Sequence, residues 1–282
     1  MRHRITLWPA GLLLTAIILG GSPAGAQNRQ FTRTVDLQPS GTLRVEGDKG
    51  SITISSWDQP QVDIRAHIEL PNDVPADYAQ AVVDATAIDV TASNGSVSVR
   101  TNYDNVPSRT GIGRWGDKTV PEVHYQIRAP RRIDLRVDSD RGPTSIRGFD
   151  GTLDIVVDRG ELDVQDAAGD VRVNIDRGEQ SRLTNVRGSL TIEADRTDLR
   201  IEAAALERDS RIEIDRGDVD MRIAPDQRLT VRTELSRRGH FRTDLPIQWM
   251  SEDQRRSEGH VNGGGPQLYV ESDRANIGLR AR

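Results

Sequence analysis

One charged tripeptide recurs through the middle of the chain, and its side chains could do chemistry. It forms five corners: Asp140-Arg141-Gly142, Asp158-Arg159-Gly160, Asp176-Arg177-Gly178, Asp195-Arg196-Thr197 and Asp215-Arg216-Gly217. The intervals between them are 18, 18, 19 and 20 residues. A beat of this length is typical of coils that stack along an axis, each burying its apolar side against its neighbours. We call these tripeptides the Asp-Arg corners.

In parallel stacking, the carboxylates of the Asp-Arg corners lie above one another at about 4.8 Å, and so do the guanidinium groups. A carboxylate row can bind Ca²⁺, and a surface of Asp and Arg can grip a charged glycan. An arginine at every step works against cation binding, and the Gly-Gly-x-Gly-x-Asp signature of calcium repeats is absent. We therefore predict no metal site and no cofactor.

We favour a structural interpretation of the Asp-Arg corners. Each Asp caps its own turn through an Asx hydrogen bond, each Arg reaches an acid one coil away, and Gly supplies the positive φ of the corner. This assigns the glycine and most of the aspartate. It leaves the arginine without a firm role, so the five corner arginines are the first candidates for ligand contact.

A polysaccharide-cleaving β-helix enzyme is the alternative. Carboxylates separated by about 5 Å or about 6.5–9.5 Å suit retaining or inverting glycoside hydrolysis. A ladder supplies such distances whatever its role, and the chain lacks the long loops that build a water-excluding cleft. No Gly-x-Ser-x-Gly elbow occurs, and the glycines at 263–265 indicate a turn. We predict no catalytic residue.

Histidines and tryptophans outside the corners complete the candidates. His67, His124, His240 and His260 are scattered, and no pair has metal-binding spacing along the sequence. Trp115 and Trp249 fall in segments predicted as loops. We expect these tryptophans to pack over the ends of the stack, and if exposed they are candidates for a glycan or protein contact.

The corners must be positioned by short strands. Aliphatic residues alternate with charged ones, as in Leu153, Ile155 and Val157 or Val171, Val173 and Ile175, which predicts one buried and one solvated face. Each beat holds two strands, one after the Asp-Arg corner and one after a second corner at Gly151, Gly169 or Gly188. Corners this tight leave no room for a crossover helix. The sequence therefore predicts a parallel β-solenoid with coils of about 18–20 residues.

The regular coils span residues 131–235, within one domain predicted over residues 27–282. Residues 27–130 form looser strands, interrupted by a short helix that starts at Pro75 and by an exposed loop at 102–118. Residues 236–282 lose the beat and end in two closing strands. We predict that the early strands and these final ones cap the stack, because an open sheet edge invites end-to-end pairing.

The N-terminus and the composition indicate export. Residues 1–26 have a basic start, an apolar run and the small-residue site Ala24-Gly25-Ala26, which predicts a signal peptide cleaved before Gln27, with an uncleaved anchor helix as the alternative. The chain has no cysteine, which excludes a lipoprotein anchor and disulfides. Removal of Arg2 and Arg4 takes the formal charge from −5 to −7, which argues against nucleic-acid binding. No later stretch predicts a transmembrane span.

Several motifs in their order resemble the bacterial putative-adhesin family, often called DUF4097. The resemblance covers nearly the whole mature chain and lies in Gly41 to Val45, Trp57-Asp58, the segment from Val123 to Pro130, Leu245-Pro246 with the turn at 263–265, and Ile277 to Arg280. It implies a right-handed parallel β-solenoid in an envelope or secreted setting and brings no catalytic residues. We therefore expect a periplasmic or extracellular, non-enzymatic binding or display module whose partners are envelope glycans or proteins. The alternative is a polysaccharide lyase or hydrolase.

Overall fold

The computed structural model describes residues 28–70, 75–107, 120–253 and 255–282. The elements of its N-terminal part are β1 (Asn28–Asp36), β2 (Thr42–Lys49), β3 (Ile52–Trp57), β4 (Gln61–Glu69), α1 (Ala76–Ala85), β5 (Ala87–Ser93), β6 (Ser96–Asn102) and β7 (Glu122–Pro130). The remaining strands are β8 (Asp134–Arg141), β9 (Thr144–Arg147), β10 (Asp150–Arg159), β11 (Leu162–Gln165), β12 (Ala168–Leu206), β13 (Ser210–Ile223), β14 (Leu229–Leu235), β15 (His240–Thr243), β16 (Ile247–Glu252), β17 (Arg256–Val261) and β18 (Gln267–Ala281).

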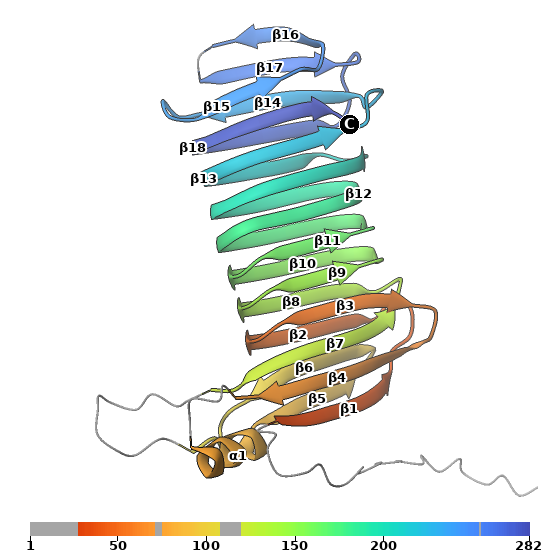
Figure 1. The fold of residues 1–282 in the computed structure, drawn as a ribbon. Helices are drawn as coiled ribbons and strands as arrows, with labels where there is room; N and C mark the ends of the chain where they lie inside the picture. The colour runs from red at the N-terminus through yellow and green to blue at the C-terminus, as the bar shows by residue number, and fades with distance from the viewer. Residues whose placement is uncertain (1–27, 71–74, 108–119, 254) are drawn as a thin grey trace, which may run out of the picture.

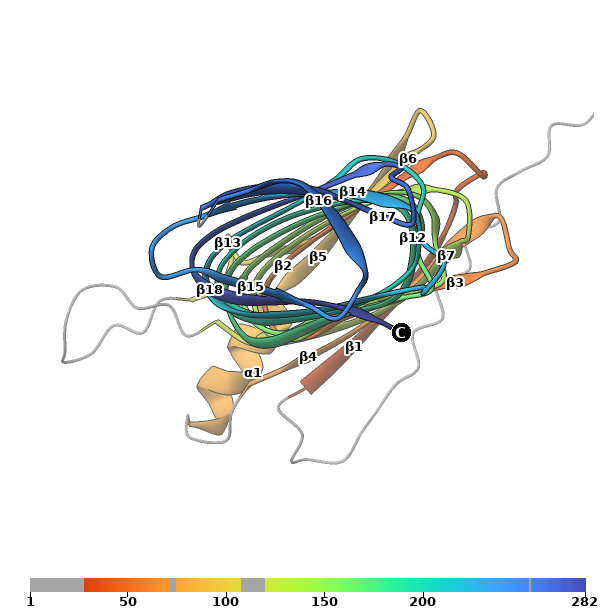
Figure 2. The same ribbon diagram turned by 90° about the horizontal axis from the view of Figure 1, so that it is seen from above.

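The middle strands pair in parallel with equivalent strands further along the chain. β10 pairs with β8 on one side and with β12 on the other, so that Val137, Ile155 and Val173 fall in one row at offsets of 18 residues. Figure 1 shows the strands stacked along one long axis, and Figure 2, seen down that axis, shows them winding round one core. The prediction of parallel pairing between successive beats is confirmed.

The strands of the described residues join into a single mixed, largely parallel sheet of 18 strands, which curls round until it is nearly closed. Strand β12 alone runs for 39 residues and passes through corners as one continuous strand. This corrects the prediction of short separate strands. The pairing continues because corner residues themselves face equivalent residues of the next coil, as Arg159 faces Arg141 and Arg177.

The core is a narrow stack of aliphatic side chains. Residues at every second position of β8 and β10 are buried, and the aliphatic positions predicted to point inward between residues 131 and 235 are all buried. Rows of like residues stack on one another, because Val45, Val137 and Ile155 are successive partners across parallel strands. Two aromatic residues, Tyr125 and Phe149, are also fully buried.

The helix predicted after Pro75 is confirmed as α1, which buries Ala79, Val82 and Val83. Thr86 follows its last residue, and the Thr86 hydroxyl donates a hydrogen bond to the Val82 carbonyl at 2.9 Å. Most of the predicted loop, residues 108–118, lies outside the described residues. Within the described ranges, no helix has the length and apolar character needed to cross a membrane.

Both ends of the stack are covered by antiparallel strands whose spatial order departs from chain order. At the N-terminal end, β2 and β3 lie between β6 and β7 on one side and β8 and β9 on the other. At the other end, β18 lies between β13 and the pair β14 and β15. The final strands are therefore not the cap that the sequence predicted, since β14 to β17 lie beyond them (Figure 1). β18 can take a place within the stack because its apolar residues continue the buried rows, as Val270 does by pairing with Ile212 of β13.

Candidate functional site

The register of the parallel strands aligns the Asp-Arg corners in one row. Arg141, Arg159 and Arg177 are successive strand partners, and Arg196 pairs with Arg216. Two further rungs were missed in the sequence. Lys49 pairs with Arg141 at one end, and Arg274 pairs with Arg216 at the other. The signals were present as Asp48-Lys49-Gly50 and Asp273-Arg274-Ala275, but the inserted segments around them break the beat.

Five arginines of the row each bridge two carboxylates. Arg159 Nε lies 3.2 Å from Oδ2 of Asp158 in its own corner, and its Nη2 lies 3.8 Å from Oδ1 of Asp140 one coil earlier. The same two contacts recur at Arg177, Arg196, Arg216 and Arg274. Arg141 contacts Asp140 of its own corner. The row is thus a continuous ladder of alternating charges, and we call it the Asp-Arg ladder.

This geometry assigns the arginine and corrects the role given to the aspartate. In the described contacts the corner carboxylates accept hydrogen bonds from arginine side chains, as Asp158 does from Arg159, rather than from their own turn as an Asx cap. The expectation that Arg reaches an acid one coil away is confirmed. The corner side chains are about half exposed, so each pair contributes only about 0.2–1 kcal/mol.

The corner glycines are required by the coil beneath them. A Cβ on Gly142, Gly160 or Gly217 would lie 1.9, 2.1 or 2.0 Å from a backbone oxygen of the preceding coil, and all three have positive φ. Gly178 differs, because its φ is not in the positive region. A Cβ added to it would still lie 2.5 Å from the Gly160 oxygen. The predicted positive φ is therefore confirmed at three of the four corner glycines.

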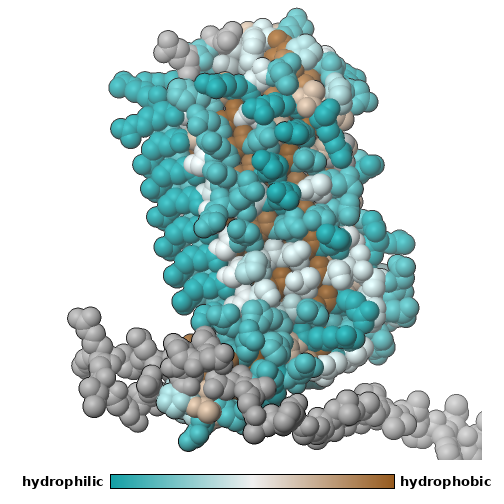
Figure 3. Space-filling model, viewed as in Figure 1, coloured by the Kyte–Doolittle hydropathy of each residue, from teal (hydrophilic) through white to brown (hydrophobic). Residues whose placement is uncertain are grey.

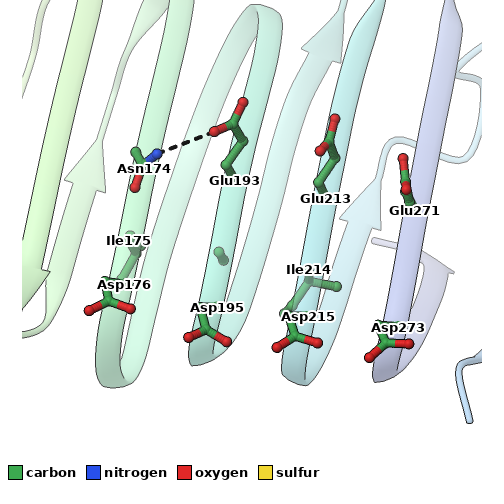
Figure 4. A pocket seen from close by; sticks show the side chains of 11 residues that line it. Asn174, Ile175, Asp176, Glu193, Asp195, Glu213, Ile214, Asp215, Glu271 and Asp273 are labelled. Carbon is green, nitrogen blue, oxygen red and sulfur yellow. Dashed lines mark hydrogen bonds between the residues drawn. The ribbon is translucent and has the colours of Figure 1, made fainter.

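An open groove of about 400 Å³ lies beside the Asp-Arg ladder, across β12, β13 and β18 (Figure 4). Its lining contains two columns of acidic side chains and no basic one. One column belongs to the ladder: Asp176, Asp195, Asp215 and Asp273. The other is formed by Glu193, Glu213 and Glu271 and continues to Asn174, which donates to Glu193 at 3.2 Å. We call this surface the acidic groove.

Cations outside the acidic groove compensate most of its carboxylates. Arg211 donates to Glu213 and, at 3.0 Å, to Glu271, and its guanidinium lies over the ring of Tyr269. The hydrogen bond from Arg274, with smaller contributions from Asp195 and Asp273, lowers the pKa of Asp215 to about 2. The Asp215 carboxylate is therefore held in its charged form.

Of the two tryptophans predicted as contact candidates, the structure describes Trp249. Trp249 lies in strand β16 rather than in a loop, and its ring packs edge-on against Phe241 at 6.5 Å between ring centres. Strand β16 lies at the end of the stack (Figure 1), and Met250, the neighbour of Trp249, is 64% exposed. Trp115 lies outside the described residues.

The sequence suggested that the histidines are scattered, but two of them lie side by side in the structure. His67 and His124 are direct partners in the antiparallel pair of β4 and β7, with ring centres 6.5 Å apart. The pair was missed because its members are 57 residues apart in the sequence and no local spacing marks them. His240 and His260 lie in β15 and β17 near the opposite end.

Comparison with solved structures finds proteins that match over most of this chain. One is described as a putative cell adhesion protein from Clostridium sporogenes, with 9% identity and a TM-score of 0.33 over 90% of this chain and 100% of that one. Another is a putative adhesin from Bacteroides fragilis, with 11% identity and a TM-score of 0.31 over 90% and 97%. A third is a putative lipid binding protein from Parabacteroides distasonis, with 8% identity and a TM-score of 0.25 over 90% and 96%.

No family model matches the sequence, and no curated protein matches it either. At these identities and TM-scores the structural similarity carries no functional argument. The function must therefore be argued from the residues of the chain itself.

Proposed function

We propose that this protein is an exported, non-enzymatic display or binding module, built as a right-handed β-solenoid of the DUF4097 adhesin type. The observation that carries the proposal is the Asp-Arg ladder beside the acidic groove. Together they form a charged, open surface fixed to a continuous core along several coils. Hydrophilic side chains cover most of the face seen in Figure 3. Such a surface suits contact with a large polar partner better than enclosure of a small substrate.

The ladder changes which residues are the best candidates for contact. Five of its arginines already hold two carboxylates each, so their charge is compensated within the row. In the acidic groove, Glu193 has only the amide of Asn174 as its described side-chain partner. We therefore propose that a glycan or protein partner meets the groove carboxylates first, through its hydroxyl groups or positive charges.

A carbohydrate-cleaving enzyme is the second candidate, because the acidic groove holds two columns of carboxylates side by side. A general acid in such an enzyme needs a raised pKa, which usually comes from burial. The pKa of the groove carboxylate Asp215 is instead lowered by the hydrogen bond from Arg274, and its side chain is partly exposed. Among the described residues, the acid with a buried side chain is Asp63, and Arg128 pairs with it at 2.8 Å. These features support the binding module.

A glycan array scored for both retention and product release tests the proposal. The mature chain is compared with a groove variant, E193Q/E213Q/E271Q, and with a matched ladder variant, R159Q/R177Q/R196Q. We expect retention without shortened products, and loss of retention in the groove variant only. Release of shortened glycans would establish the enzyme instead. Failure to retain any glycan or any envelope protein would overturn the binding function.

The proposed setting is the periplasm or the cell exterior, reached through the signal peptide at residues 1–26 and without a lipid anchor. The signal segment and the absence of cysteine support it. The partners proposed are envelope glycans or proteins, and nucleic acid is not among them.

A further inference from the structure

Two strands at the N-terminal end of the stack bring histidine and glutamate side chains together. β4 and β7 run antiparallel, with His67 opposite His124 and Glu69 opposite Glu122. Because residues two apart in a strand point to the same face, all four side chains share one face of the pair. Their side chains are 30–46% exposed, so solvent ions can reach them.

Three of these side chains converge closely enough to share one ion. His124 Nε2 lies 3.1 Å from Oε1 of Glu69 and 3.7 Å from Oε2 of Glu122. Their ligand atoms all lie within 4.8 Å of one another. Metal bonds of about 2.0–2.2 Å in tetrahedral geometry place ligand atoms about 3.3–3.6 Å apart. The two separations from His124 are close to that spacing. Side-chain rotation that brings the two carboxylates to the same spacing closes the site.

Neighbouring side chains hold these three ligands in place. His67 Nε2 lies 3.1 Å from the second oxygen of Glu69, and Lys49 Nζ lies 3.2 Å from the Glu122 oxygen that faces away from His124. Each carboxylate thus has one oxygen held by a neighbour and the other directed at His124. Such supporting contacts are what orient the ligands of metal sites.

Ser51 controls the proton on His124. The backbone N–H of Ser51 donates to Nδ1 of the ring at 3.2 Å, which places the ring proton on Nε2, beside Glu69. A metal ion that takes the Nε2 lone pair requires the proton to move to Nδ1. Ser51 Oγ lies 2.9 Å from Nδ1 and can accept it there. Ser51 is therefore a positioning residue: its backbone N–H donates to the metal-free ring, and in the metal-bound ring its hydroxyl accepts from Nδ1 while the backbone N–H gives up this hydrogen bond.

The ligand types select the class of ion. One imidazole and two carboxylates suit a borderline divalent transition metal such as Zn²⁺, whereas Ca²⁺ and Mg²⁺ prefer oxygen ligands alone and in larger number. We propose that His124, Glu69 and Glu122 bind a divalent transition-metal ion of the zinc class. The ion joins β4 to β7 and keeps a fourth coordination position towards solvent, as three-ligand sites do.

Calorimetric titration of the untagged mature chain with ZnCl₂ tests the site. We expect one ion per chain, at least tenfold weaker binding in H124Q and E69Q, and no effect of H260Q, a matched histidine at the opposite end. Saturating Zn²⁺ raises the melting temperature of the wild type but not of H124Q. CaCl₂ and MgCl₂ give neither effect.

Three positioning variants distinguish this site from a structural hydrogen-bond network. S51A and H67A each weaken Zn²⁺ binding by about tenfold, while H67Q, which keeps a donor towards Glu69, restores part of it. Co²⁺ bound to the wild type gives the strong visible absorption of a low-coordinate site, and H124Q does not. Equal Zn²⁺ binding in the wild type, H124Q and E69Q would show only adventitious metal and overturn the proposal. So would a wild type without binding at micromolar Zn²⁺.

Discussion

Arg216 Nη2 lies 3.2 Å from Oδ1 of Asp195, although the two residues are 21 positions apart in the sequence. The same guanidinium holds Asp215 of its own corner at 3.1 Å through Nε. The contact links two coils from the outside, and its repetition makes the Asp-Arg ladder. Because like charges one coil apart repel, the arginine between each two carboxylates is what makes an acidic row tolerable at this spacing.

The ladder should be a modest and salt-sensitive source of stability. R216Q is expected to lower the free energy of unfolding by about 1 kcal/mol at low ionic strength, because two exposed ion pairs are lost. In 1 M salt, where the screening length falls to about 3 Å, most of this difference disappears. Denaturant titrations at both salt concentrations measure it. R132Q serves as the control, since Arg132 is exposed and has no ion pair among the described contacts. A loss that persists unchanged in salt would contradict a purely electrostatic ladder.

Substitution by alanine should destabilise the fold much more at a corner glycine than at a turn glycine. G160A is expected to destabilise the fold by at least about 2 kcal/mol, since its Cβ would lie 2.1 Å from the Gly142 oxygen and one coil would have to move away. G95A has a φ of +73° but nothing within 4 Å of the added Cβ, so only backbone strain of about 1 kcal/mol applies. Thermal melts of the two variants make the comparison. Equal losses would show that φ alone, and not coil contact, selects glycine at the corners.

Acid should weaken the far end of the ladder. Because the hydrogen bond from Arg274 lowers the pKa of Asp215 to about 2, the carboxylate stabilises the folded state above its ordinary pKa of 3.8. That contribution is lost as the pH falls from about 4 to about 2. In R274Q the pKa should return towards its ordinary value. Carbon-detected NMR titration of the Asp215 carboxyl measures this, and an unchanged pKa in R274Q would exclude the assigned cause.

Alkali should weaken the N-terminal part of the stack. Burial raises the pKa of Tyr125, whose hydroxyl forms a hydrogen bond of 2.7 Å with Thr101 Oγ1. A raised pKa means that its stabilisation is complete below the ordinary pKa of 10 and is lost as the pH rises further. Burial raises the pKa of Tyr103 in the same way. Y125F should reduce the fall in stability between about pH 10 and pH 12, as measured by denaturation at each pH. An unaltered fall would place the alkaline sensitivity elsewhere.

Export can be checked from the N-terminus of the mature protein. We expect N-terminal sequencing of the exported chain to begin at Gln27, and fractionation to find the protein outside the cytoplasm. A26D, which places a charge at the cleavage position, should leave the leader attached. Recovery of the full-length wild type from the cytoplasm would contradict the signal peptide.

Local pattern was enough to predict the middle of the fold. Alternation placed Leu153, Ile155 and Val157 in the core, and the spacing of the corners gave the parallel register, because each coil repeats the same local chemistry. The ends could not be predicted this way. The insertion of β18 between β13 and β14 depends on which partners best match its apolar row, and such a choice leaves no periodic mark in the sequence.

The candidate sites show the same division. The corner residues of the Asp-Arg ladder were found because they recur. The hydrogen bonds of the corner aspartates were assigned to Asx turns, since the sequence does not show which donor reaches a carboxylate first. The pairing of His67 with His124 was missed altogether. It could have been proposed from the motifs His67-Ile68-Glu69 and Glu122-Val123-His124, whose mirrored order brings like residues together once two strands are antiparallel.

The placement of β18 also sets an order of assembly. Strands β8 to β13 can add to one another as soon as each is available, but β14 and β15 find their parallel neighbour only in residues 267–281. Until that segment arrives, the exposed edges of β13 and β14 have no partner between them. A chain that crosses a membrane from its N-terminus therefore completes its last internal coil only after almost all of its length has emerged, and interruption before that step leaves two edges open to pairing with other chains.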